Sequence, residues 1–324
     1  MYVTRVTKLI HKLFFLRIWL ILSVLCGTAC EAPLNLEGVK AQSHQSILRF
    51  DHYQAAATNN DSIVVVGSAG VVLVSTDKGE SWSRQILSDY PALIDVVACP
   101  DSSYVALDFN HNIWSSNDNA RTWNKRSIDS TEVPQAITCD PDNKIWVVAS
   151  FSTILNSPDQ GDTWESISMD EDLMLTSIQF IDEQTVFVTG EFGTVLKSSN
   201  AGKTWDYMEP LPGGFYPQAS YFMDSENGWV VGLRGKVFYT NDGSNSWQLQ
   251  PTDIDIPLYG VMAGESKVYA VGDTGKVLEY DNGQWQQLSH DFPIRFYLRA
   301  VLQLNDKSIL LAGGAGALHK YKFD

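Results

Sequence analysis

Short apolar runs alternate with polar turns along most of the chain. Seven such runs each follow a polar turn: Ile63–Val66, Tyr104–Leu107, Ile145–Val148, Thr185–Val188, Trp229–Val231, Val268–Val271 and Ile309–Leu311. They are too short for helices and rich in β-branched, aromatic and leucine residues, so each predicts a buried strand. Five of them lead into tight Gly-x-x-Gly turns: Gly67–Gly70, Gly190–Gly193, Gly232–Gly235, Gly272–Gly275 and Gly313–Gly316. The pattern therefore predicts a series of β-hairpins.

A second motif, S-x-D-x-G-x-T-W, recurs with matching spacing. Four good copies are followed by two degenerate ones: Ser75–Trp82, Ser116–Trp123, Ser157–Trp164, Ser198–Trp205, Thr240–Trp247 and Tyr280–Trp285. The closing tryptophans are 41, 41, 41, 42 and 38 residues apart. Repeats of this length, built from short strands and polar turns, are typical of propeller blades. We therefore predict an all-β fold, a seven-bladed β-propeller of four-stranded antiparallel blades over residues 45–324.

The repeated motif resembles the Asp box (BNR repeat) known from sialidases and other propellers. Its aspartate is expected to accept backbone N–H groups across a hairpin turn, while its glycine takes a positive φ. The tryptophan then packs over the hairpin. An active site needs one constellation, whereas this box recurs in blade after blade. We interpret it as structural rather than as a catalytic or metal site.

The seventh repeat has no Asp box after its strand Ala317–Phe323. Its fourth strand is expected to come from the N-terminal side. The segment Ser46–Phe50 has suitable β character. We predict that this segment closes the ring by covering the open edge of the last blade.

The N-terminal region has the pattern of a targeting segment. Basic residues precede the apolar run Ile18–Leu25, and small residues follow it, which predicts a signal peptide over residues 1–29. Gly27-Thr28-Ala29-Cys30 is similar to a bacterial lipobox with Cys30 as the lipidated residue; ordinary cleavage after Ala29 is the alternative. Residues 30–44 would form a tether. The expected location is exported, as a periplasmic or cell-envelope lipoprotein.

Charge and composition exclude several classes of function. The formal net charge is −15, and residues 1–29 hold four of the 23 basic residues and no acid, so cleavage leaves 19 basic against 38 acidic side chains, or −19. Such a surface repels nucleic acid. No histidine has metal-ligand spacing and no glycine-rich loop joins a strand to a helix, so we predict neither metal nor cofactor.

Two cysteines, Cys99 and Cys139, lie forty residues apart, at equivalent places in neighbouring repeats. They could form a disulfide in an oxidising compartment. Two buried free thiols are the favoured interpretation.

Two loops between repeats are rich in aromatic residues and proline: Pro210–Pro217 and His290–Tyr297. Such loops favour protein recognition. The partner-binding candidates are Phe215, Tyr216, Arg234, Phe292, Arg295, Tyr297 and Arg299. The three arginines could form one basic spot on an acidic body. Alternatively, the rings fill gaps between blades.

The signal segment, seven repeats, Asp boxes and Gly-x-x-Gly turns together resemble the photosystem II assembly and stability factor family. The units Val66–Trp82 and Thr189–Trp205 carry the likeness best, and it extends over residues 46–324. The resemblance implies a propeller that binds newly made reaction-centre subunits with an arginine-rich patch. Here only one Gly-x-x-Gly turn contains an arginine.

We therefore expect a monomeric, non-enzymatic, protein-binding propeller that assists a membrane protein complex. The alternative is an extracytoplasmic carbohydrate-binding protein or a sialidase-like glycoside hydrolase. A glycosidase usually needs two facing carboxylates. Nothing in the sequence singles out such a pair.

Overall fold

The computed structural model describes residues 45–264, 267–289, 294–304 and 307–323. The predicted signal peptide, the tether and Cys30 lie outside these residues. Residues Ser46–Asp324 make up one compact unit. Within the described ranges, no helix is long and apolar enough to cross a membrane.

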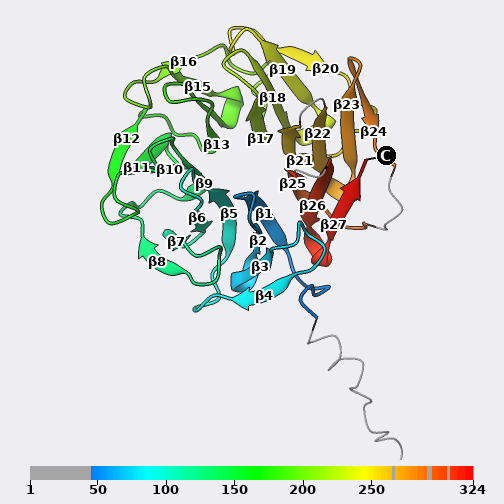
Figure 1. Cartoon of the computed structure of the whole chain (residues 1–324). Coiled ribbons are helices and arrows are strands. Elements are labelled where there is room, and N and C mark those ends of the chain that lie inside the picture. The colour runs from blue at the N-terminus through cyan, green and yellow to red at the C-terminus, as the bar shows by residue number, and fades with distance from the viewer. Residues whose placement is uncertain (1–44, 265–266, 290–293, 305–306, 324) are drawn as a thin grey trace, which may run out of the picture. The chain divides into compact units, whose positions relative to one another are not determined.

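Seven antiparallel sheets are arranged in a ring around a central channel (Figure 1). In each sheet the strands follow one another in chain order, from the channel outward. The innermost strands are β1 (Tyr53–Thr58), β5 (Leu93–Ala98), β9 (Pro134–Cys139), β13 (Leu175–Phe180), β17 (Pro217–Phe222), β21 (Leu258–Ala263) and β25 (Leu298–Leu304). The second strands are β2 (Ile63–Gly67), β6 (Tyr104–Asp108), β10 (Ile145–Ala149), β14 (Val186–Gly190), β18 (Asn227–Gly232), β22 (Val268–Gly272) and β26 (Ser308–Gly313).

The third strands are β3 (Val71–Ser75), β7 (Asn112–Ser116), β11 (Thr153–Ser157), β15 (Val195–Ser198), β19 (Val237–Asn241), β23 (Val277–Asp281) and β27 (Leu318–Lys322). Six sheets have a fourth, outer strand: β4 (Ser83–Ile86), β8 (Asn124–Ser127), β12 (Glu165–Ser168), β16 (Asp206–Tyr207), β20 (Gln248–Gln250) and β24 (Gln284–Gln287). The sheets are numbered below as blades 1 to 7 in chain order. The seven apolar runs of the sequence coincide with the second strands, so the predicted seven-bladed propeller is confirmed.

Burial explains why the second strands were the strongest signal in the sequence. Nearly all their residues are buried, because another strand flanks them on each side and a neighbouring blade covers each face. The outer strands are exposed and mostly polar. Apolar clusters fill the space between adjacent blades, including one that joins blade 7 to blade 1.

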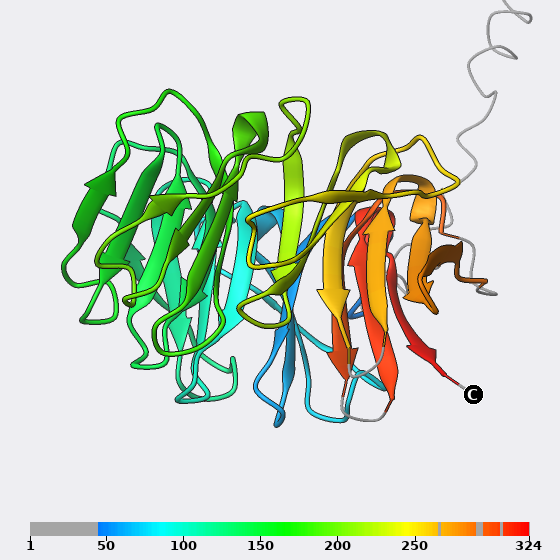
Figure 2. The same ribbon diagram turned by 90° about the horizontal axis from the view of Figure 1, so that it is seen from above.

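The strand order gives the propeller two distinct faces. In an antiparallel four-stranded blade, the turn between the second and third strands lies on the same face as the loops between blades. We call this the turn face. The Asp-box hairpins and the turns between the first and second strands lie on the other side, which we call the hairpin face. Figure 2 shows the ring from its edge, with the connections gathered at the two ends of the strands.

The five Gly-x-x-Gly segments form tight turns on the turn face, as predicted. They contain the short 3-10 turns η1 (Ser68–Gly70), η2 (Glu191–Gly193), η3 (Leu233–Gly235), η4 (Asp273–Gly275) and η5 (Gly314–Gly316). The middle residue of each has a left-handed conformation, with φ between 52° and 61°. The last glycine of each turn also has positive φ, and a Cβ at Gly193 would lie 2.5 Å from the Leu211 carbonyl oxygen. These glycines let each turn press against the following loop.

The first five Asp boxes fasten hairpins, as the sequence analysis predicted. In the first box, Asp77 accepts hydrogen bonds from the Ser75 hydroxyl (2.8 Å) and from the backbone N–H (2.9 Å) and hydroxyl (2.5 Å) of Ser81. The hydrogen bonds from Ser81 are the main cause that lowers the pKa of Asp77 to about 2. The pKa of Asp118 is likewise lowered to about 2, chiefly by Thr122. In the fourth box an amide, Asn200, accepts the equivalent bond from the Thr204 N–H at 2.9 Å.

The last blade differs from the prediction because it has three strands among the described residues, and residues 46–50 form bends and a turn rather than a strand. The segment still ties the blades together. Asp51 lies at the junction: its backbone oxygen accepts the Gly316 N–H of blade 7 at 2.9 Å. Its carboxylate accepts hydrogen bonds from both terminal guanidinium nitrogens of Arg84 on blade 1, at 2.7 and 2.8 Å. Closure therefore rests on this junction and on apolar packing, and the predicted closing strand is wrong.

The two cysteines form a disulfide with their Cα atoms 5.3 Å apart. Cys99 directly follows β5 and Cys139 ends β9, so the bond links the inner strands of blades 2 and 3. The favoured interpretation as two free thiols is therefore wrong. The equivalent positions of the two residues in adjacent blades bring them together.

Replacing Arg84 with Met is expected to destabilise the fold by about 3 kcal/mol, because it leaves the buried Asp51 carboxylate without its cation. The Asp51 side chain is 1% exposed. Arg126 pairs with Asp162 at a similar distance but on the surface, with 36% and 63% of the two side chains exposed. Arg126→Met should therefore cost less than about 1 kcal/mol in urea unfolding. Equal losses for the two variants would contradict a closing role for the Asp51 junction.

Acid is expected to weaken the Asp boxes. Because the folded pKa of Asp77 and Asp118 is about 2, below the ordinary 3.8, their contribution is present above pH ~4 and is lost as the pH falls towards 2. The double variant Asp77→Asn, Asp118→Asn copies the amide of the fourth box and should show a smaller fall in melting temperature over this range. Asp129→Asn is the control, since Asp129 accepts no hydrogen bond from any described residue. A double variant with an unchanged pH dependence would refute this origin of acid sensitivity.

Candidate functional site

The central channel is lined by all seven innermost strands. It encloses a cavity of about 210 Å³. Each innermost strand has a β-bulge near its start, which leaves one residue out of the pairing register. These residues all line the cavity: Gln54, Ile94, Gln135, Thr176, Gln218, Tyr259 and Arg299. Bulges re-aim side chains, and here they present a mainly polar ring to the channel.

Asp95 and Arg299 are the charged residues among the described residues that line this cavity. The Asp95 carboxylate accepts the Val96 N–H at 2.8 Å and the Ile137 N–H of the next blade at 2.9 Å. Burial raises the pKa of Asp95 to about 6, while these hydrogen bonds and the charge of Arg299 oppose the rise. The carboxylate thus bridges blades 2 and 3 at the channel wall.

An aromatic group lies beside the channel mouth on the turn face. The Tyr297 ring stacks on His52 with centroids 6.2 Å apart and meets Tyr259 edge to face at 6.2 Å. Gln54 donates to the Tyr297 hydroxyl at 3.2 Å. These contacts tie blades 1, 6 and 7 together and place Arg299 next to rings that can stack on a bound chain.

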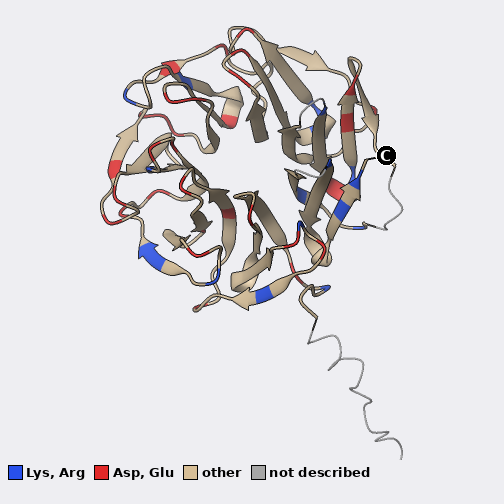
Figure 3. Ribbon diagram, viewed as in Figure 1, with Lys and Arg blue, Asp and Glu red and all other residues tan. Residues whose placement is uncertain are grey.

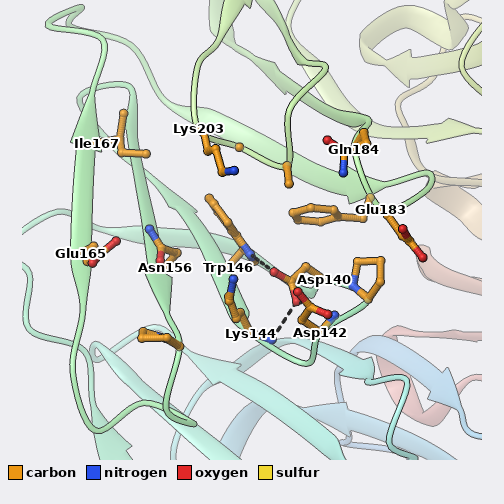
Figure 4. Close-up of a pocket in the computed structure, with 15 residues that line it drawn as sticks. Asp140, Asp142, Lys144, Trp146, Asn156, Glu165, Ile167, Glu183, Gln184 and Lys203 are labelled. Atoms are coloured by element: carbon orange, nitrogen blue, oxygen red, sulfur yellow. Dashed lines mark hydrogen bonds between the residues drawn. The ribbon is translucent and has the colours of Figure 1, made fainter.

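A larger pocket, of about 620 Å³, lies between blades 3 and 4 on the hairpin face (Figure 4). Its floor is Trp146, which packs against Phe180 and donates its indole N–H to Asp140 at 3.1 Å. Glu165 and Glu183 lie on opposite sides of this floor (Figure 4). Asp140 also accepts the backbone N–H groups of Asp142 and Lys144, so it serves a strand-to-strand turn.

Among the described residues, the channel wall does not supply the carboxylate pair that the hydrolase alternative requires. Asp95 is the one carboxylate among the described residues of the channel wall, where a glycosidase would need two. In the described ranges no three His, Cys, Asp or Glu side chains gather closely enough to hold a metal ion.

Exposed aromatic residues are concentrated on the turn face. Eleven large hydrophobic side chains are exposed among the described residues, and seven of them belong to turns or loops of this face: Phe50, Tyr90, Phe109, Phe151, Phe192, Leu233 and Phe296. On the hairpin face the corresponding residue is Met223. The exposed apolar side chains of the described residues are therefore divided unevenly between the two faces.

Three of these aromatics have an uncommon backbone conformation. Tyr90, Phe151 and Phe192 have φ of 50°, 51° and 58°. Bulky residues in this left-handed region cost free energy, of the order of 1 kcal/mol or more. Because the three rings are exposed, burial of their own side chains does little to offset this cost.

The residues predicted from the sequence have mixed positions. Phe215 is 6% exposed and packs on Phe238 between blades 4 and 5, so it fills a gap and is unavailable to a partner. Tyr216 is half-buried and bonded to Glu191. Arg234 is exposed beside Asp255, at 3.2 Å. Arg295 and Arg299 are exposed in the approach to blade 7 and in its inner strand, with Tyr297 between them. Phe292 lies outside the described residues.

The sequence analysis missed the aromatic turn tips Phe109, Phe151 and Phe192. They occupy equivalent places in blades 2, 3 and 4, between the second and third strands. The repeat pattern contained the information needed to find them. It places these residues at the tips of tight turns, where a ring has no strand partner. Only one of the three lies in a Gly-x-x-Gly turn.

The ring of seven sheets and its Asp-box hairpins define an Asp-box seven-bladed β-propeller. The family model of the photosynthesis system II assembly factor YCF48 matches residues 115–219. This match confirms, over that stretch, the resemblance to the photosystem II assembly factor family. A search of curated proteins found no match.

Solved structures share the fold at low sequence identity. YCF48 from Cyanidioschyzon merolae is 15% identical with a TM-score of 0.68, covering 86% of this chain and 98% of its own. A structure of YCF48 bound to D1 peptide is 16% identical with a TM-score of 0.69, covering 86% and 96%. Virginiamycin B lyase from Staphylococcus aureus is 11% identical with a TM-score of 0.74, covering 87% and 97%. The fold is therefore common to assembly factors and to an enzyme.

The coupling of Asp95 to Arg299 can be measured directly. Arg299→Met removes a positive charge that lowers the pKa of Asp95, so that pKa is expected to rise above about 6. Carboxyl-carbon NMR titration of Asp95 would follow it. Arg295→Met is the control, because Arg295 is exposed and does not line the cavity. An unchanged titration in Arg299→Met would show that the two groups do not interact.

Proposed function

We propose that this protein is a non-catalytic, protein-binding propeller that assists the assembly or stability of a membrane protein complex. The observation that carries the proposal is the concentration of exposed aromatic residues on the turn face, three of them in strained conformations. Exposing a large apolar side chain forgoes about 1.5–3 kcal/mol of burial. A partner that covers these rings recovers that free energy.

The similar proteins support a binding role. The family matched over residues 115–219 is an assembly factor family, and one structure with the same fold holds a D1 peptide. By analogy, the partner here is a segment of a membrane protein subunit. Arg234, Arg295, Tyr297 and Arg299 remain candidates for contact with it, together with Phe109, Phe151 and Phe192.

The proposal includes an exported location, with Cys30 as the lipidated residue and residues 30–44 as the tether. The N-terminal targeting pattern supports this location. The Cys99–Cys139 disulfide also supports it, because disulfides persist mainly in oxidising compartments. A lipid anchor would hold the propeller near the membrane subunits it assists.

Removal of the turn-tip rings is expected to abolish recovery of the membrane partner. In the variant Phe151→Asn, Phe192→Asn, asparagine tolerates the left-handed backbone, so the melting temperature should stay the same or rise. Tagged protein would be purified from detergent-solubilised membranes of the source organism, and the subunits that accompany it quantified. Met223→Ser, on the hairpin face, should retain them.

Equal recovery by the two variants would place the binding surface elsewhere. Turnover of glycosides by the purified wild-type protein would contradict the non-catalytic role.

A further inference from the structure

One sector of the turn face combines exposed aromatics with acidic side chains. It spans blades 2 to 4 and consists of the loops 87–92, 128–133, 169–174 and 208–216 with the turns 109–111, 150–152 and 191–194. We call it the aromatic–acidic sector. Its exposed rings are Tyr90, Phe109, Phe151 and Phe192, with exposed fractions of 72%, 52%, 55% and 68%.

The charge of this sector is of one sign. It contains eight acids and no lysine or arginine: Asp89, Asp129, Glu132, Asp170, Glu171, Asp172, Glu191 and Glu209. All the residues of the sector are described, and only Asp89 has a salt bridge within the described part of the chain, to Lys125 at 3.2 Å. Figure 3 shows the acidic residues around the ring and the few basic ones among them.

Hydrogen bonds hold the sector in place. Glu191 accepts the Met174 N–H at 2.8 Å, and Glu132 accepts the Ser150 hydroxyl at 2.8 Å. The Ser152 N–H donates to the Leu173 carbonyl at 2.8 Å. The first two bonds join the turns of blades 4 and 3 to the loops that precede those blades, and the third joins the turn of blade 3 to the loop that follows it. The rings and the acids are therefore presented on a fixed backbone.

The acids also affect a neighbouring ring. Tyr207 is 55% exposed at the end of β16, and its phenol has a raised pKa because of partial burial and the nearby charges of Glu171 and Asp170. The negative field thus reaches the aromatic surface around it.

The hairpin face lacks this combination. Its acids are interspersed with Lys78, Arg121, Lys144 and Lys203, and its Asp-box carboxylates accept hydrogen bonds within their own turns. The acidity of the aromatic–acidic sector is therefore a local feature and does not simply reflect the negative net charge of the chain.

On the basis of the proposed function, we propose that the aromatic–acidic sector binds a segment of the partner protein that is both apolar and positively charged. Apolar side chains of the segment cover the rings of Phe109, Phe151 and Phe192. Its lysines or arginines lie over the unpaired acids, where opposite charge favours encounter and fixes the register. Arginine can in addition stack on the exposed rings.

The predicted partner segment is cationic, whereas an arginine-rich patch would select an anionic one. The sector has no cation with which to hold a carboxylate or phosphate. An anionic segment would be repelled by the five acids that are exposed and unpaired among the described residues: Asp129, Asp170, Glu171, Asp172 and Glu209.

The test uses three labelled synthetic peptides of equal length with the purified mature protein. The first peptide alternates lysines with leucines. The second has glutamate in place of lysine, and the third has serine in place of leucine. Fluorescence anisotropy should show that the lysine–leucine peptide binds at least about tenfold more tightly than either of the others. Raising the salt from about 50 mM to about 300 mM should weaken it, since exposed charges are screened.

Two variants separate the apolar and charged contributions. Phe151→Asn, Phe192→Asn should reduce affinity by about tenfold or more at any salt concentration. Asp170→Asn, Glu171→Gln, Asp172→Asn should reduce affinity at low salt and flatten the salt dependence. The matched control, Asp61→Asn, Glu183→Gln, Glu226→Gln, removes three exposed acids from the hairpin face and should change little beyond a small general effect of net charge.

Other outcomes overturn the inference. Equal or tighter binding of the glutamate peptide would show that the sector does not select cations. The wild type could instead bind no peptide but bind vesicles of neutral phosphatidylcholine, with this binding lost in the ring variants. That result would assign the sector to the membrane surface. Ring-dependent recovery of a membrane subunit without preference for the cationic peptide would overturn this inference alone. Absence of both would overturn the proposed function as well.

Discussion

The architecture depends on closing the ring between blades 7 and 1. Each of the other blade interfaces joins sheets whose strands succeed one another along the chain. The last interface must instead join residues from the two ends of the propeller, as the Gly316–Asp51 hydrogen bond does across 265 positions of the chain. Asp51 serves both partners: its backbone holds the η5 turn, and its carboxylate holds Arg84 while also accepting the Leu48 N–H and the Tyr53 hydroxyl. A buried carboxylate with four donors is stable only when all are in place, so this junction favours one register of closure.

A closed ring also sets the conditions for binding. The second strands are buried on both faces and cannot contribute to recognition, which is left to the turns, the loops and the exposed positions of the inner and outer strands. Their backbones are rigid because the turn glycines press on the following loops, as Gly193 does on Leu211. The ring at Phe192 is therefore held on a fixed turn, and the turn of Phe151, which has no glycine, is held by the hydrogen bond from the Ser152 N–H to the Leu173 carbonyl. Little conformational entropy needs to be lost when a partner covers them.

The sequence predicted those features that are repeated. Seven buried strands and the Asp boxes recur, so each copy supports the interpretation of the others. The strands and the first five boxes were confirmed, whereas the sixth, degenerate copy is a two-residue turn between the paired Asp281 and Gln284. The closing segment occurs once, and its β-like composition gave no sign that Asp51 would meet Arg84. The burial of Phe215 was equally hidden, because a loop phenylalanine looks the same whether it faces Phe238 or solvent. The cysteines were paired by the geometry of adjacent blades, which their forty-residue spacing implies without giving the distance between them.

The fold of an assembly factor and an acidic surface are compatible for a physical reason. The fold is determined by buried positions, and these are filled by apolar residues whatever the partner. Partner choice is determined by exposed turns, where a charge can be replaced with little effect on folding. A propeller can therefore keep the architecture that it shares with YCF48 from Cyanidioschyzon merolae at 15% identity while its exposed charges differ. In this chain Arg234 is paired with Asp255, whereas most acids of blades 2 to 4 have no cation beside them among the described residues. The uncompensated charge on the turn face is therefore negative, and a cationic partner gains the most binding free energy there.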